Sequence, residues 1–144
     1  MKRKIQTALL ILTLTFIWGH SLVPADTSSL ESGRVLELLR PVLETLLGAG
    51  NVSEYLVRKM AHFTEFAALG FQLALFLPPL RGPRRVLRAV EMGFFAAFLD
   101  ESIQLLTEDR SGRLQDVWID TAGVLFGALV ALAVWHASRR TPDR

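Results

Sequence analysis

The sequence of 144 residues contains no cysteine, which excludes disulfide bonds and thiolate metal sites. It also lacks internal repeats and low-complexity tracts, and no feature beyond its arginines supports nucleic-acid binding. We therefore expect no nucleic-acid partner. Charged residues are few, at 21%, whereas 51% of the residues are hydrophobic and the mean hydropathy is positive. This balance is unusual for a soluble protein of this length and indicates a membrane protein.

The apolar residues are concentrated in four runs, each about long enough to cross a bilayer as a helix. We expect helices at about residues 5–23, 52–77, 86–106 and 116–137. The chain is thus predicted to be an all-α, polytopic membrane protein, with a four-transmembrane-helix bundle in a single domain over residues 1–144. The first run, which follows three basic residues, also fits a cleaved signal peptide. Its length and the even helix count favour a retained helix.

Basic residues gather in three segments that alternate with the apolar runs. These segments are the N-terminus, the connection between the second and third runs, and the tail, and they hold ten of the sixteen basic residues: Lys2, Arg3, Lys4, Arg81, Arg84, Arg85, Arg88, Arg139, Arg140 and Arg144. The positive-inside rule assigns them to the cytoplasm. We therefore expect a multi-pass protein of the plasma (inner) membrane, with both termini cytoplasmic and its acidic side facing out.

The connection between the first two runs carries an amphipathic pattern over about residues 29–47. Leucine and valine recur there at helical spacing, and Ser28 with Glu31 matches a capping box at its start. We expect an extracytoplasmic amphipathic helix, which Pro41 breaks into two pieces. A packing lid over the bundle is favoured over a lipid-binding device. Asn51 and Glu54 match a second capping box, at the start of the next helix.

Ten acidic, basic or amide side chains lie at the ends of the last three apolar runs, where each ionised group costs on the order of 3 kcal/mol. They are Lys59, His62 and Glu65; Asp100, Glu101 and Gln104; and Arg110, Arg113, Asp116 and Asp120. The predicted topology places all of them on the outward side, and antiparallel helices joined by short loops pack side by side. We therefore expect one shared polar pocket that opens outward.

The final run contains Gly123 and Gly127 in a GxxxG arrangement, and Ala131 continues the stripe of small residues. Small residues at this spacing let another backbone approach closely. The spacing predicts a close helix–helix contact, chiefly with a helix of the same chain. A homo-oligomer that uses the same stripe is the alternative.

The stretch Asp100-Glu101-Ser102-Ile103-Gln104, followed by Arg110, Asp116, Asp120, Gly123 and Gly127, closely resembles the signature of the VanZ-like family, and Lys59, His62 and Phe63 resemble its second-helix motif. Two positions depart from that pattern. Ile103 stands where many members carry a second histidine, and Thr107-Glu108-Asp109 stands where a Pro-Gly turn is common. The resemblance implies an integral membrane protein whose named relatives lower susceptibility to teicoplanin-type glycopeptides, and it implies no established catalytic mechanism.

Three functions fit these residues. In the favoured one, the pocket binds an envelope component, either a lipid-linked wall precursor or a glycopeptide-type ligand, and the arginines hold its phosphate or carboxylate. The ligand-binding residues would be Lys59, Glu65, Asp100, Gln104, Arg110, Arg113, Asp116 and Asp120.

The second function is a membrane-embedded enzyme that modifies an envelope lipid or glycan, with His62 as general base and Glu101 as acid or metal ligand. The third is a structural bundle whose polar groups pair among themselves. Membrane lipids are expected partners. No cofactor is expected, although one histidine with several carboxylates would suit a divalent cation.

Overall fold

The computed structural model describes residues 2–77 and 82–139, which form five α-helices and one short 3-10 helix, with no strand among them. The elements are α1 (Lys2–Ser21), α2 (Ala25–Leu47), η1 (Ala49–Asn51), α3 (Glu54–Phe76), α4 (Gly82–Leu105) and α5 (Leu114–Ser138). The all-α prediction is confirmed. Arg81, Arg140 and Arg144 lie outside the described residues.

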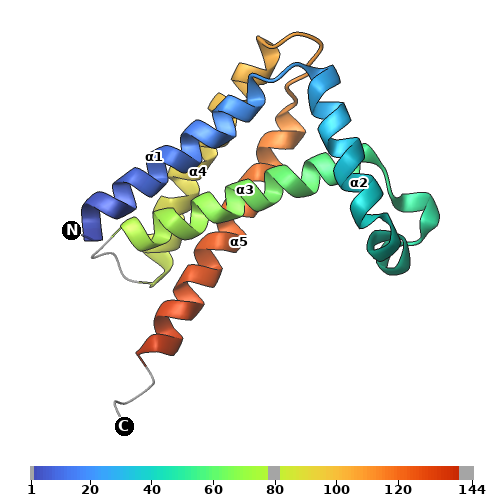
Figure 1. The fold of residues 1–144 in the computed structure, drawn as a ribbon. Helices are drawn as coiled ribbons and strands as arrows, with labels where there is room; N and C mark the ends of the chain where they lie inside the picture. Colours follow the sequence, from blue (N-terminus) through green and yellow to red (C-terminus); the bar gives the residue numbers. More distant parts are fainter. Residues whose placement is uncertain (1, 78–81, 140–144) are drawn as a thin grey trace.

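Four helices, α1, α3, α4 and α5, pack together, and α3 makes its most extensive contact with α5. Figure 1 shows that successive members run in opposite directions: the start of α1, the end of α3, the start of α4 and the end of α5 all lie toward the lower left. The turn from α1 to α2 and the loop from α4 to α5 meet at the top of the same view. Polar residues near these turns are therefore brought to one end of the bundle.

The packing of α5 on α3 depends on glycine. A Cβ at Gly123 would strike the carbonyl oxygen of Phe63, and one at Gly127 would strike that of Ala67. On α3, a Cβ at Gly70 would overlap the backbone of Val124. On α4, a Cβ at Gly93 would overlap the side chain of Val124. We call these residues of α3, α4 and α5, namely Gly70, Gly93, Gly123, Val124 and Gly127, the close-packed segment. The close contact that the GxxxG spacing predicts is therefore made with α3 of the same chain.

Two capping predictions and the predicted break at Pro41 are wrong. α2 begins at Ala25 with Pro24 as its N-cap, so Ser28 lies inside the helix. α3 is capped by Ser53, whose Oγ accepts from the amide of Leu56 at 3.2 Å. α2 also continues through Pro41. A proline removes one backbone donor, but this stretch of α2 is exposed, so solvent can satisfy the carbonyl that loses its partner.

The backbone of α2 lies close to that of α3 and of the short η1, and not to the backbones of the other helices that the structure describes. Leu36 and Leu43 pack against Val57 of α3, while leucines elsewhere on α2, such as Leu38 at 79% exposure, remain open. Figure 1 shows α2 descending away from α1, α4 and α5 after the turn at the top and passing the start of α3. The prediction of a lid over the bundle is therefore wrong for most of α2, and only its first turns reach the polar end.

Helix length and composition identify one clear membrane span among the described residues, α5. α1 and α2 pass the same test only together, as a pair bent by 109°. α3 and α4 carry charged residues along their length, such as Lys59 and Glu65 or Asp100 and Glu101, and these lower their hydropathy. By this criterion four spanning helices are not established.

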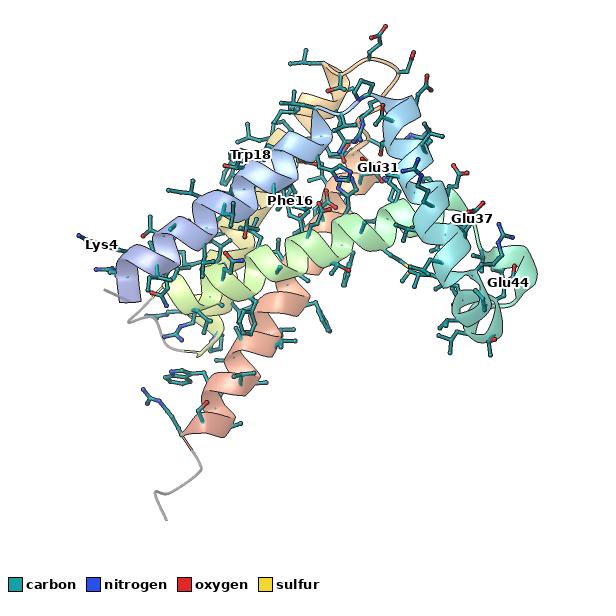
Figure 2. All side chains as sticks on the ribbon, in the orientation of Figure 1. Lys4, Phe16, Trp18, Glu31, Glu37 and Glu44 are labelled. Atoms are coloured by element: carbon teal, nitrogen blue, oxygen red, sulfur yellow. The ribbon has the colours of Figure 1, made fainter. Side chains whose placement is uncertain are left out.

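The bundle has a buried apolar core, but it also exposes many large apolar side chains and buries several charged ones. Large apolar side chains cover the outside of α1, α4 and α5, as at Leu12, Phe95 and Phe126. In contrast, Asp100 and Asp120 are 0% and 1% exposed. The stick view in Figure 2 shows apolar side chains, including Phe16, projecting from the outer surface of α1.

Candidate functional site

Six of the ten polar residues singled out in the sequence line a cavity of about 180 Å³ at the top of the bundle. They are Lys59, His62, Gln104, Arg110, Arg113 and Asp116. Asp100, Glu101 and Asp120 are buried next to them, whereas Glu65 turns toward α1. We refer to Lys59, His62, Asp100, Glu101, Gln104, Asp116 and Asp120 as the polar cluster.

The base of the polar cluster is formed by one imidazole and two carboxylates from three helices. The Nδ1 atom of His62 lies 3.8 Å from Oδ2 of Asp100 and 4.0 Å from Oδ1 of Asp120. These distances are too long for hydrogen bonds. Nδ1 of His62 and Oδ2 of Asp120 are buried and have no hydrogen-bond partner within the described protein. The three side chains offer one ligand atom each, all within 4.8 Å of one another, so they could hold a metal ion.

Asp100 is held in place from two helices. Ser21, the last residue of α1, donates its hydroxyl to Oδ1 of Asp100 at 2.6 Å. Gln104, one turn further along α4, donates from Nε2 to Oδ2 at 2.9 Å. These bonds fix the orientation of a carboxylate that would otherwise be costly to bury.

Glu101 and the start of α5 are joined by one hydrogen bond. The backbone amide of Arg113, the N-cap residue of α5, donates to Oε2 of Glu101 at 2.8 Å. The other oxygen, Oε1, accepts from Gln104 at 3.4 Å. A carboxylate at a helix N-terminus is favoured by the helix dipole. Glu101 thus fixes the loop that carries Arg110 and Arg113 against the end of α4.

Lys59 and Asp116 form an ion pair between α3 and α5, with Nζ 2.5 Å from Oδ2. The same Nζ lies 5.3 Å from the ring centroid of Tyr55, one turn earlier on α3. The second oxygen of Asp116, Oδ1, is buried without a hydrogen-bond partner. One acid that the sequence placed in the pocket therefore has its charge balanced within the protein.

Glu65 lies outside the cavity and faces His20, with Oε1 at 3.6 Å from Nδ1 of that imidazole. His20 also lies 3.5 Å from Glu31 of α2, through Nε2, and stacks on His62 at 6.3 Å between ring centroids. Figure 2 shows Glu31 on α2 beside the end of α1. Histidines and acids thus continue from the cavity to the side where α1, α2 and α3 meet.

Two arginines carry unsatisfied donors. In Arg110, Nε and Nη2 are buried and have no hydrogen-bond partner among the described residues. In Arg58, Nη2 donates to the hydroxyl of Ser29 at 3.0 Å, but Nε is unpartnered. Burial lowers the pKa of the Arg110 guanidinium, and the neighbouring positive charge of Arg58 lowers it further. Two guanidinium groups facing one small cavity, with donors to spare, suit an anionic group with several oxygens.

Sequence reasoning missed four residues of this region: His20, Ser21, Tyr55 and Arg58. His20 and Ser21 lie near the end of the first apolar run, where polar residues are ordinary and do not by themselves indicate a site. Arg58 directly precedes Lys59, and only the helix phase decides which of the two faces α5. Their positions relative to the polar cluster depend on helix packing.

A sequence model of the VanZ/LLP1 family matches residues 7–135 of this chain. The match covers α3 and α4 entirely, most of α1 and α5, and each of the ten polar residues. No curated protein and no solved structure matches the chain significantly. The family match confirms the resemblance that the residues from Lys59 to Gly127 suggested. The chain therefore belongs to the VanZ/LLP1 family.

Proposed function

We propose that the protein is integral to the plasma membrane and that α1, α3, α4 and α5 all span the bilayer. The supporting observation is that large apolar side chains are exposed while Asp100 and Glu101 of α4 are buried. Lys59 and Glu65 of α3 are partly buried, with side chains 16% and 14% exposed. In lipid, polar groups of a helix must face other helices or a water-filled cavity. The charged residues that lower the hydropathy of α3 and α4 therefore do not oppose insertion of these helices into the bilayer, since the bundle shields them from lipid.

The same proposal places the start of α1 and the end of α5 in the cytoplasm. Arg84, Arg85 and Arg88 at the start of α4 lie at that same end of the bundle, together with Arg139. This agrees with the positive-inside rule. α2 then lies at the outer interface, with exposed leucines for the lipid boundary and Glu37 and Arg40 for water.

We propose that the cavity binds the phosphate or diphosphate of a lipid-linked envelope precursor. Arg110 is the observation that carries this proposal, because its two unpartnered donors lie in a cavity that Arg58, Lys59 and Arg113 also line. Lys59 is balanced by Asp116, but Arg110 and Arg58 have donors available. A phosphate oxygen would satisfy these donors at lower cost than leaving them buried and unpaired.

Two apolar grooves make a lipid-linked ligand more suitable than a free anion. Grooves of about 440 and 490 Å³ lie beside α3 and share Phe16, Thr64 and Glu65 in their lining. Glu65 joins them to the polar side through its pairing with His20. A head group in the cavity and an isoprenoid chain against α1 and α3 would use both kinds of surface. Binding of such a precursor would connect the protein to lowered glycopeptide susceptibility, and a glycopeptide-type ligand is the alternative occupant.

Binding of a fluorescent polyprenyl diphosphate to the full-length protein in lipid nanodiscs tests this function. Arg110→Ala should weaken binding by at least about tenfold, since a charge-assisted contact is lost. Arg40→Ala is the matched control, because Arg40 is exposed on α2 and pairs locally with Glu44. Equal affinities for the wild type and the folded Arg110→Ala variant would exclude the cavity as the binding site.

A membrane-embedded enzyme is a second candidate, and one observation favours it. His62 lines the cavity while its Nδ1 is unpartnered and faces two carboxylates, an arrangement in which it could accept a proton from an attacking water or hydroxyl. Glu101 would then act as the acid and Arg110 would stabilise developing negative charge. Turnover of a labelled envelope precursor by the purified protein should disappear in His62→Ala, and unchanged turnover would remove His62 from that role.

A purely structural role is opposed by the unpartnered atoms. Self-paired polar groups would leave few buried donors and acceptors unsatisfied, yet His62, Arg110, Asp116 and Asp120 each retain at least one. If the role is structural, His62→Ala and Glu101→Ala should reduce folded protein in the membrane. We expect both variants to insert and remain folded while the resistance phenotype is lost.

A further inference from the structure

We propose that His62, Asp100 and Asp120 form a binding site for one divalent cation at the base of the cavity. The site would use Nδ1 of the imidazole and one oxygen from each carboxylate, drawn from α3, α4 and α5. This inference deepens the proposed anion-binding function and rests on it for its role, because the cation would be the partner of the bound phosphate.

The ligand atoms have the separations of a shared ion rather than of direct hydrogen bonds. Nδ1 of His62 is 3.8 and 4.0 Å from the two carboxylate oxygens. Ligands of a tetrahedral ion at bonds of roughly 2.1 Å lie about 3.4 Å apart. A contraction of a few tenths of an ångström would therefore bring Nδ1 and each of these oxygens to the separation of shared ligands, whereas a direct hydrogen bond would need a movement of about 1 Å.

Burial and charge point to the same ligand. Asp120 is 1% exposed, and its Oδ2 is buried without a partner; Nδ1 of His62 is also buried and unpartnered. Two carboxylates close together in a buried site repel each other and are desolvated. Lys59 is committed to Asp116 at 2.5 Å, so it does not directly pair with either of them. A divalent cation would balance both carboxylates and satisfy the unpartnered atoms at once.

The surrounding hydrogen bonds resemble the outer shell of a metal site. Ser21 and Gln104 each donate one hydrogen bond to Asp100. These bonds fix the plane of the carboxylate and leave each oxygen with a lone pair that could bind an ion. His62 lines the cavity, so an ion held by the three side chains would keep open positions on the cavity side. A phosphate held by Arg110 could occupy such a position.

The donor set identifies the class of ion. One imidazole nitrogen with two carboxylate oxygens suits Mn²⁺ or Zn²⁺, whereas Mg²⁺ prefers oxygen ligands and retains several waters. We therefore expect Mn²⁺ and Zn²⁺ to compete for one site and Mg²⁺ to compete weakly.

The test uses the chelator-treated, full-length protein in detergent, titrated with Mn²⁺ while free Mn²⁺ is followed by electron paramagnetic resonance. The wild type should saturate near one equivalent, and Zn²⁺ should displace the bound ion. Asp120→Asn should weaken binding by at least about tenfold. Glu37→Gln, an acid-to-amide change at an exposed position on α2 (Figure 2), should bind as the wild type does.

A spectroscopic measurement on the wild type keeps the proposal testable if Asp120→Asn does not fold. Bound Mn²⁺ should show electron-spin-echo modulation from a coordinated imidazole nitrogen, because His62 is the only nitrogen ligand in the site. No saturable binding, or bound Mn²⁺ without this nitrogen coupling, would overturn the proposal. The titration contains no lipid, and Arg110→Ala should bind Mn²⁺ normally. Failure of the cation site and failure of anion binding are thus distinguishable.

Discussion

Along α5, the first turns carry Asp116 and Asp120 into a polar interior, whereas later turns carry Gly123 and Gly127 against the backbone of α3. The two interiors differ in how tightly they are packed and in how many of their buried polar atoms are hydrogen-bonded. In the close-packed segment there is no room for one further carbon atom at Gly70 or Gly127. Around the polar cluster there is a cavity of about 180 Å³, and several buried donors and acceptors have no partner.

This difference indicates how the molecule tolerates an unfavourable interior. Unpartnered buried atoms cost free energy, and they persist only where the rest of the structure fixes their positions. The close-packed segment begins on α5 only three residues after Asp120, so backbone contacts between α3 and α5 set the separation of the helices that carry His62 and Asp120. The close-packed segment would thus position the polar cluster, and substitutions can perturb each of them separately.

The largest expected effect is in the close-packed segment. Gly127→Ala should lower the free energy of unfolding by about 4 kcal/mol, because the added methyl group meets the backbone of Ala67 and Phe71 and neither can move independently. Thermal unfolding of the purified protein in detergent measures this. Gly19→Ala is the matched control: nothing lies within 4 Å of its Cβ position, so it should be neutral or slightly stabilising. Equal effects at both positions would contradict the proposed role of α3–α5 packing.

The next largest effect is expected at the ion pair in the polar cluster. Lys59→Met should cost about 3 kcal/mol, since it leaves Asp116 buried without its cation. Adding Asp116→Asn should recover much of that loss, because the second change removes the uncompensated charge. A double-mutant cycle by thermal unfolding gives the coupling. Additive losses in the double variant would show that the pair contributes no coupling.

A smaller loss is expected where α1 joins the polar cluster. Ser21→Ala should cost about 2 kcal/mol, because the hydroxyl donates to a fully buried carboxylate, Asp100. Ser102→Ala is the control, since the hydroxyl of Ser102 bonds only to the carbonyl of Phe98 in its own helix. If both variants unfold at the same temperature, the bond from α1 does not contribute to holding the cluster.

The smallest effect is expected in the loop above the cavity. Asp109 has φ of 55°, the left-handed region that glycine adopts more easily than other residues. Asp109→Gly should therefore stabilise the turn by about 0.5 kcal/mol. Glu108→Gly, one position earlier and without positive φ, should not stabilise the protein. A lower unfolding temperature for Asp109→Gly would show that the carboxylate matters more than the backbone conformation.

Several features of the fold follow from local sequence and were predictable. Apolar runs of bilayer length separated by basic segments predict an all-α chain, and the motif from Asp100 to Gly127 identifies the family. Helix starts were less predictable: the capping boxes indicated Ser28 and Asn51, whereas the N-cap residues are Pro24 and Ser53. Pro41 failed as a break because its surroundings are exposed.

The ten polar residues were recognisable from the sequence because charge in an apolar run is costly wherever it lies. The spacing along each helix, however, does not specify its partners. Helix packing alone decides the pairs that form. Lys59 pairs with Asp116, Glu65 faces His20 outside the cavity, and Ser21 donates a hydrogen bond to Asp100. Their ligands and chemical roles are proposals that the experiments above test.

The sequence by itself determined the helical composition, the family and the set of polar residues that interrupt the apolar runs, because hydropathy and charge are properties of single residues and short periods. The tertiary structure alone decided which charges are balanced and which remain unpartnered. Those relations depend on the rotation and separation of α1, α3, α4 and α5. Between α3 and α5, glycine contacts set the separation, and they join residues more than fifty positions apart.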